Sequence, residues 1–236
     1  MAIRILSDNS IQIGDYTLSE STTGLVFTGK ASAVASNTVV YSPLVGTVSG
    51  YTSGGTTPPA LNTIDKFPFA SDANATDVGD LTQARYGAAG QSSAVSGYTS
   101  GGGFPIQNTI DKFPFATNAN ATDVGDLTQG RYHVAGQSSA VSGYTPGGST
   151  NPSPSVRQNT IDKFPFASDA NATDVGDLTQ ARYYVAGQSS NVSGYTSGGW
   201  DPAQNTIDKF PFASDANATD VGDLTQARFG PAGQQD

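Results

Sequence analysis

The sequence feature that most constrains this chain is an internal repeat. The segment Asn62–Arg85 reads NTIDKFPFASDANATDVGDLTQAR. Three copies follow it, at Asn108–Arg131, Asn159–Arg182 and Asn205–Arg228. The last two copies are unchanged, and the first differs only at Thr117, Asn118 and Gly130. Self-similarity at a period of about 20–50 residues is typical of propellers, solenoids and arrays, in which each unit buries its faces against its neighbours.

Each full unit predicts four short strands. From Arg85 onward these are YGAAGQSS, AVSGYTS, NTIDKFPF and TDVGDLT. The first is rich in small residues, as expected where strands crowd together, and the third alternates between two faces. ASDANA supplies turn residues between the third and fourth strands. Pro68 is expected near a strand end, because proline donates no ladder hydrogen bond.

The motifs GYTSGG and GYTPGG resemble the glycine doublet that closes the second strand of a kelch repeat. The doublets are Gly54 and Gly55, Gly101 and Gly102, Gly147 and Gly148, and Gly198 and Gly199. The arginines that open successive units, Arg85, Arg131, Arg182 and Arg228, lie 46, 51 and 46 residues apart. The resemblance covers the chain from about Thr38 onward, with leucine where kelch units carry a late tryptophan. It implies an all-β fold, a kelch-like β-propeller of four repeats with four strands per blade.

Two domains are expected. Residues 41–236 would form the propeller, and residues 1–40 a short N-terminal β-segment that serves as an anchor. IRILSDNSIQIGDYTL predicts a hairpin around an Asp-Asn turn, and GLVFTG a third strand. We expect the ring to close within one chain, with Arg228–Asp236 supplying the first strand of the first blade. The alternative is an arc that closes by association with other copies.

All length variation falls between each glycine doublet and the next asparagine, where the chain inserts TTPPAL, GFPIQ, STNPSPSVRQ and WDPAQ. In a propeller equivalent loops emerge on one face, so this pattern predicts a standard scaffold that presents variable loops. The candidate binding residues on this face are Phe104, Arg157, Trp200 and Asp201. Phe104 and Trp200 are aromatic anchors of the kind found at binding hot spots.

The composition excludes several function classes. The net charge of −9 argues against nucleic acid and anionic membranes as partners, because both require clustered lysine and arginine. The chain has no cysteine and a single histidine, His133, so thiolate nucleophiles and histidine-rich metal centres are absent. His133 occupies the position of Gly87, Tyr184 and Gly230 in the other units, which favours a tolerated surface or blade-start residue over a catalytic base. We expect no enzymatic activity.

Two groups of charged residues recur in every unit, and each has two interpretations. Asp72, Asn74, Asp77 and Asp80 could bind calcium, but they lack the order of a calcium loop, so turn residues and no cofactor are favoured. Asp65 and Lys66 could join blades as an ion pair, but solvated rim charges are favoured. Each opening arginine is expected to bond carbonyl groups or aspartates of the adjacent blade.

Units of the NTIDKFPFA type resemble virion proteins of tailed phages. The resemblance implies a non-enzymatic virion structural protein of a tail, baseplate, fibre or capsid, synthesised in the host cytoplasm. Residues 1–40 would bind other virion proteins, and the loops would contact a virion subunit or a glycan or protein of the host surface. The alternatives are a cellular kelch-type interaction module and a carbohydrate-active propeller enzyme.

Overall fold

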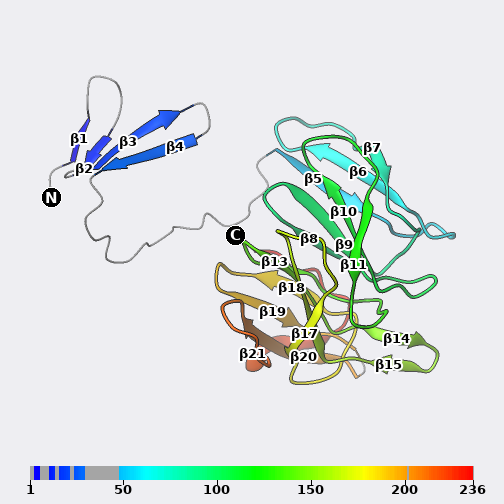
Figure 1. Cartoon of the computed structure of the whole chain (residues 1–236). Coiled ribbons are helices and arrows are strands. Elements are labelled where there is room, and N and C mark those ends of the chain that lie inside the picture. Colours follow the sequence, from blue (N-terminus) through cyan, green and yellow to red (C-terminus); the bar gives the residue numbers. More distant parts are fainter. Residues whose placement is uncertain are drawn as a thin grey trace. The chain divides into compact units, whose positions relative to one another are not determined.

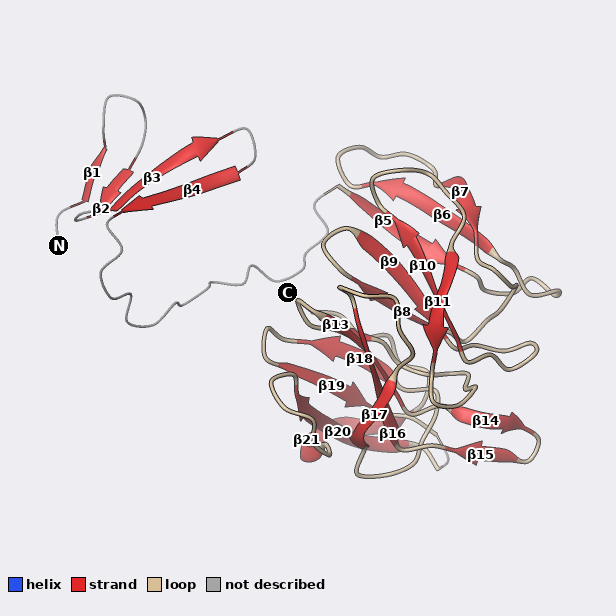
Figure 2. Cartoon of the chain, in the orientation of Figure 1, coloured by secondary structure: helices blue, strands red, loops and turns tan. Residues whose placement is uncertain are grey.

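The computed structural model describes residues 3–5, 11–13, 16–21, 24–29, 48–200 and 202–235, and every regular element in them is a β-strand (Figure 1, Figure 2). Residues 48–235 contain 17 strands in five sheets. Within the described ranges no helix is long and apolar enough to cross a membrane. The chain divides into two compact units, Met1–Val40 and Tyr41–Asp236.

The N-terminal unit contains one antiparallel sheet in the order β1-β2-β3-β4. The strands are β1 (Ile3–Ile5), β2 (Ile11–Ile13), β3 (Tyr16–Ser21) and β4 (Gly24–Gly29). Ile3 pairs with Ile13 across the first hairpin, and Leu18 pairs with Phe27 in the second. The predicted hairpin and the predicted strand over GLVFTG are confirmed, and β3 is an additional strand between them.

The second unit repeats one antiparallel sheet. Its clearest example has the order β8-β9-β10-β11, with β8 (Ala89–Ser92), β9 (Ser96–Ser100), β10 (Thr109–Pro114) and β11 (Thr122–Asp126). The four strands predicted for a full unit are confirmed in this sheet, each shorter than predicted. The next two sheets follow the same order, with β12 (Gln137–Ser138), β13 (Ser142–Pro146), β16 (Thr160–Pro165) and β17 (Thr173–Asp177), then β18 (Ala186–Ser189), β19 (Ser193–Ser197), β20 (Gln204–Pro211) and β21 (Thr219–Arg228).

The first sheet of this unit has only three strands in the described residues. They are β5 (Ser49–Ser53), β6 (Thr63–Pro68) and β7 (Thr76–Asp80). Pro68 ends β6, as its missing donor predicts, and the equivalent prolines end the third strands of the other sheets.

Consecutive sheets are joined by three equivalent hydrophobic cores. In each core the isoleucine and leucine of one sheet pack against a phenylalanine and an alanine of the next. Between the second and third sheets, for example, Ile110 and Leu127 contact Phe164 and Ala172. The repeat thus buries its apolar residues between units, as expected for a chain whose single units cannot form a core alone.

Glycines let the first strands of neighbouring sheets approach closely. A Cβ atom on Gly136 would lie 2.3 Å from the carbonyl oxygen of Gly90, and one on Gly187 would lie 2.4 Å from that of Gly136. These distances exclude any side chain, so the small residues predicted for this strand are required by backbone contact between sheets.

Closure within the chain, which the sequence favours, is not seen in the described residues. The C-terminal segment Ala232–Gln235 does not pair with β5. It lies beside the fourth sheet, where Gly233 approaches Gly187 and the Gln235 Oε1 atom accepts a 2.5 Å hydrogen bond from the Ser189 backbone N–H. Ser138 and Ser189 occupy the equivalent place against the preceding sheets. The segment therefore continues the array as the start of a further unit.

Candidate functional site

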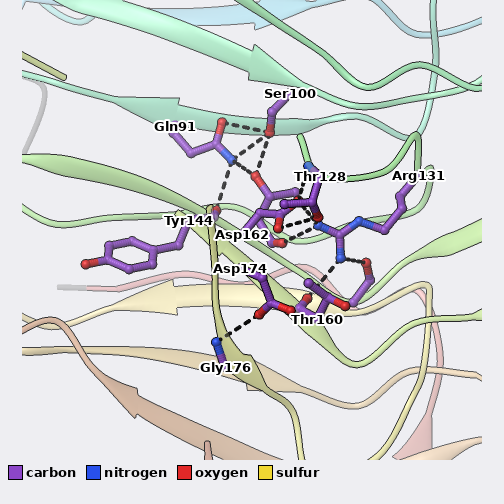
Figure 3. A network of polar contacts seen from close by, with 11 residues as sticks. Gln91, Ser100, Thr128, Arg131, Tyr144, Thr160, Asp162, Asp174 and Gly176 are labelled. Atoms are coloured by element: carbon purple, nitrogen blue, oxygen red, sulfur yellow. Dashed lines mark hydrogen bonds and ion pairs between the residues drawn. The ribbon is translucent and has the colours of Figure 1, made fainter. Parts of the chain in front are cut away.

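Three of the opening arginines, Arg85, Arg131 and Arg182, each bridge two sheets, and Figure 3 shows the arrangement around Arg131. The Arg131 Nη2 atom lies 2.6 Å from the Asp162 Oδ2 atom of the next sheet, and both side chains are fully buried. Arg131 also donates to the carbonyl oxygens of Gly147 and Thr160, at 3.1 and 2.9 Å. The predicted bonding of the arginine to the adjacent unit is confirmed, and it recurs in the pairs Arg85–Asp111 and Arg182–Asp208.

These aspartates correct one expectation from the sequence. The copies of Asp65 in the later units are not solvated rim charges, because Asp111, Asp162 and Asp208 have no exposed surface. Asp162 further accepts hydrogen bonds from the backbone N–H and the hydroxyl of Thr128, at 3.0 and 2.7 Å. Burial lowers the pKa of Arg131, and the charge of Asp162 opposes that shift. Because the Asp162 carboxylate is buried and bonded to both Arg131 and Thr128, its role is structural.

The glycine doublets close the same junction. Gly148 donates its backbone N–H to the Arg182 carbonyl oxygen at 2.9 Å, and a Cβ atom on Gly147 would lie 2.8 Å from that oxygen. Both glycines have positive φ angles, 69° and 98°, which other residues rarely adopt. Each doublet thus holds the backbone of the arginine that opens the next unit.

Among the calcium candidates, Asp77 makes the turn contact that the sequence favours. The Asp77 Oδ1 atom accepts a 3.1 Å hydrogen bond from the Gly79 N–H, and the backbone N–H of Asp80 donates to Asn120 at the same distance. Lys112 pairs with Asp169, an equivalent of Asp72, at 2.9 Å. In the described residues no group of three or more acidic or histidine side chains could hold a metal ion. Calcium binding remains an untested alternative, and Asn74 makes no contact that favours it.

The variable segments all leave from the ends of the second strands. The longest forms an extra hairpin of β14 (Ser149–Pro152) and β15 (Ser155–Arg157), which projects from its sheet in Figure 1. Arg157 ends this hairpin and is exposed. Asp201 lies outside the described residues.

Beneath these segments lies a continuous group of aromatic side chains, here called the aromatic ridge. Phe104 stacks on Tyr86 with ring centroids 5.9 Å apart, and Tyr86 contacts His133. At the other end Trp200 meets Phe229 at 4.6 Å. The ridge comprises Tyr86, Phe104, Tyr132, His133, Tyr183, Tyr184, Trp200 and Phe229.

The repeat explains why these rings meet. His133 donates its backbone N–H to the Gly87 carbonyl oxygen at 2.6 Å, Tyr184 donates to His133 at 3.0 Å, and Gly230 donates to Tyr184 at 2.9 Å. Equivalent residues of successive units thus form a column, in which the His133 and Tyr184 rings stack 3.7 Å apart. The neighbouring aromatics are tied to the variable segments, since Tyr183 exchanges two backbone hydrogen bonds with Trp200.

The column carries backbone strain at two positions. Gly87 and Gly230 have a φ of 63°, and His133 and Tyr184 adopt almost the same angle, 53° and 55°. A non-glycine residue in this left-handed region costs about 1–3 kcal/mol, and such strain concentrates at functional sites. Two units therefore hold an aromatic ring where the geometry favours glycine.

The ridge is electrically neutral at pH 7. Burial lowers the pKa of His133 to about 4, so its imidazole is uncharged. Burial also raises the pKa of Tyr132 and Tyr184, whose hydroxyl groups stay protonated. Phe104 and Phe229 are 65% and 55% exposed. The ridge thus exposes Phe104, Tyr184 and Phe229, while Tyr132 and Tyr183 are buried beneath its surface or beside the variable segments.

The structure brings together the two aromatic candidates from the sequence. Phe104 and Trp200 lie at opposite ends of the ridge, joined by rings whose role was not predicted. His133 lies half-buried at the start of its unit, where it stacks at the centre of the ridge, a contact that the sequence did not predict. The signal was present in the sequence, as an aromatic residue at a position that holds glycine in two units. No family model matches the chain, and no curated protein matches it in sequence.

Proposed function

We propose that this chain is a non-enzymatic virion structural protein whose four sheets are blades of a kelch-like β-propeller, and that the aromatic ridge binds a neutral glycan of the host surface. The observation that carries the binding role is the ridge itself: eight aromatic residues in contact beneath the variable segments. The virion assignment rests on the resemblance of the units to phage virion proteins.

The chemistry of the ridge favours a neutral sugar. The C–H faces of a sugar ring stack on aromatic rings, and hydroxyl groups at the edge of the platform accept and donate hydrogen bonds. The net charge of −9 disfavours nucleic acid, the other ligand class that stacks on aromatic platforms. Strain at His133 and Tyr184 supports a binding role, because a purely structural column is built equally well by Gly87 and Gly230.

The sole tryptophan makes the binding test direct. Trp200 lies in the ridge, so its fluorescence reports on this site alone. We expect a panel of neutral hexose and N-acetylhexosamine oligomers to contain members that change this emission saturably. Phe104→Ala should weaken the response at least tenfold. Val95→Ala should leave it unchanged, because Val95 is 69% exposed but precedes β9, whereas the variable segments follow the second strands. Absence of any saturable response across the panel would exclude the glycan proposal.

The virion role has its own test. We propose that residues 1–40 attach the protein to a particle. Their deletion should abolish incorporation into particles while leaving oligosaccharide binding by residues 41–236 intact. A cellular kelch-type interaction module, the second candidate, predicts no particle association in either form.

A further inference from the structure

The two end sheets of the array carry complementary surfaces that are largely uncovered within the described residues, although Ser197 of the fourth sheet is only 5% exposed. We propose that a second copy of this chain docks head to tail, so that the fourth sheet of one copy packs against the first sheet of the next. The leading face is defined by Thr52, Asp65, Phe67 and Phe69 of the first sheet. The trailing face is defined by Ser197, Ile207, Leu224 and Arg228 of the fourth.

The leading and trailing faces carry opposite charges. Arg85, Arg131 and Arg182 are buried and paired with the aspartate of the following sheet. Arg228 is exposed, and among the described residues its guanidinium bonds only the carbonyl oxygen of Gln226. Asp65, the equivalent of the paired aspartates, has no ion-pair partner in the described part of the chain. The fourth sheet therefore has the arginine of such an ion pair without its aspartate, and the first sheet has the aspartate without its arginine.

The apolar surfaces match as well. Phe67 is 37% exposed and Phe69 is 52% exposed, whereas Phe164, the equivalent of Phe67, is 1% exposed. On the trailing face Ile207 and Leu224 are half-buried, although the equivalent residues of the other sheets are covered almost completely. Docking would bury the two phenylalanines against Ile207 and Leu224, in a fourth hydrophobic core equivalent to the three between consecutive sheets.

The hydroxyl contacts follow the same pattern. Ser53 and Thr99 share a 2.7 Å hydrogen bond between the first two sheets, and Ser100 and Thr145 share one of 2.8 Å between the next two. Thr52 is the equivalent of Thr99 and Thr145, but it is exposed. In the docked pair it would face Ser197.

A groove at the leading end fits the missing strand. Within the described residues β5 pairs only with β6, and a cavity of about 580 Å³ lies between β5 and β8, lined by Gly50, Tyr51 and Gln91. In the complete sheet β8 pairs with β9, with Gln91 opposite Tyr98. In that register the C-terminal segment Ala232–Gln235 of the second copy would place Gln234 opposite Tyr51. A strand added to a free sheet edge gains main-chain hydrogen bonds.

The step between sheets explains why the occupant is a second copy. The three internal interfaces use the same residues, so each step repeats one rotation. After three such steps the fourth sheet has not reached the first, because Arg228 and Phe69 are still exposed. A head-to-tail interface between identical copies then builds either a closed ring or an open filament.

Light scattering on the purified chain tests the proposal. We expect a mass that is a multiple of 24.1 kDa, fixed for a ring or rising with concentration for a filament. Arg228→Asp and Asp65→Arg should each give the single-chain mass. An equal mixture of the two variants should assemble again, because every docked pair then joins opposite charges. A wild-type chain that stays at 24.1 kDa at all concentrations, or a mixture that stays dissociated, would overturn the proposal.

A second pair of variants distinguishes loss of assembly from unfolding of the chain. Thr52→Lys adds a charge to the exposed leading face and should raise the dissociation constant of the assembly at least tenfold. Ala140→Lys adds the same charge to an exposed turn of the third sheet and should not. Equal assembly of the two variants would show that the leading face is not the interface. A double variant Asp65→Arg with Arg228→Asp that stays at 24.1 kDa and is more stable than either single variant would show closure within one chain instead.

Discussion

The Arg131 guanidinium and the Asp162 carboxylate form an ion pair of 2.6 Å that joins two neighbouring sheets without exposure to solvent. The same pair recurs at the other two internal junctions. Each junction thus combines an apolar core with one buried pair of charges. Because a charge left alone in the interior is costly, every junction depends on both partners.

Asp162→Asn should lower the free energy of unfolding by about 3–5 kcal/mol, because the Arg131 guanidinium would remain buried without its counter-charge. Urea denaturation followed by circular dichroism measures the change. Asp65→Asn is the matched control, since Asp65 has the same sequence surroundings and no buried arginine. It should change the stability of the single chain by less than about 0.5 kcal/mol. Equal losses in the two variants would contradict the role assigned to the pair.

Gly136→Ala should destabilise the protein by about 1–3 kcal/mol, because its Cβ atom would lie 2.3 Å from the Gly90 carbonyl oxygen and backbone cannot move aside cheaply. At Gly90 the same substitution meets no atom within 4 Å. Gly90→Ala should therefore be nearly neutral in thermal denaturation of the single chain. If Gly136→Ala proves as mild as Gly90→Ala, the close approach of the first strands is wrong.

Asn118→Asp should add an ion pair. Lys112 and Lys163 each bond an aspartate of the next sheet, at 2.9 and 2.8 Å, but the equivalent partner of Lys66 is Asn118. The new pair would be exposed, so we expect a gain of about 0.2–1 kcal/mol that disappears in 1 M salt. Thermal denaturation at low and high salt measures it. A loss of stability at low salt would count against the equivalence of the two sites.

His133 should make stability depend on pH between about 6.5 and 4. Its pKa is lowered from 6.5 to about 4 by burial, and the groups that face it are the rings of Tyr86, Tyr132, Tyr183 and Tyr184. As pH falls below 6.5 the unfolded chain binds a proton that the folded chain does not, so the free energy of unfolding decreases until about pH 4.

His133→Gly keeps the left-handed backbone conformation and removes the titrating group. The melting temperature of the native protein should fall relative to that of this variant as pH decreases from 6.5 to 4. Above pH 7 the difference between the two should be constant. Parallel curves over the whole range would mean that the imidazole is not shielded from water.

The local structure could be predicted from the sequence. Of the contacts between units, only the bonding of the opening arginines to the adjacent unit was predicted, without the identity of the aspartate. The alternation in Thr63–Pro68 and the glycine doublets determine strands and turns within a few residues, so the four strands of each unit were recoverable. The sequence Asp-Lys in each third strand is typical of a surface strand. Only the packing of one sheet on the next places Asp111 beside Arg85, and that contact has no local signature.

Whether the four units close into a ring could not be predicted from the sequence, for a related reason. Whether four units complete a ring depends on the rotation at each junction, which arises from the summed packing of residues such as Ile110 and Phe164. The ridge was missed because the φ angles of His133 and Tyr184 are set by the column of backbone hydrogen bonds between units.

The uniform junction between sheets has an evolutionary consequence. Because each unit makes the same contacts with its neighbours, these contacts do not depend on its place in the array. Unequal crossing-over between copies such as Asn62–Arg85 and Asn159–Arg182 would add or remove whole units and leave every remaining junction intact. The gene can therefore change length in steps of one unit without compensating mutations, while the segments after the glycine doublets diverge independently.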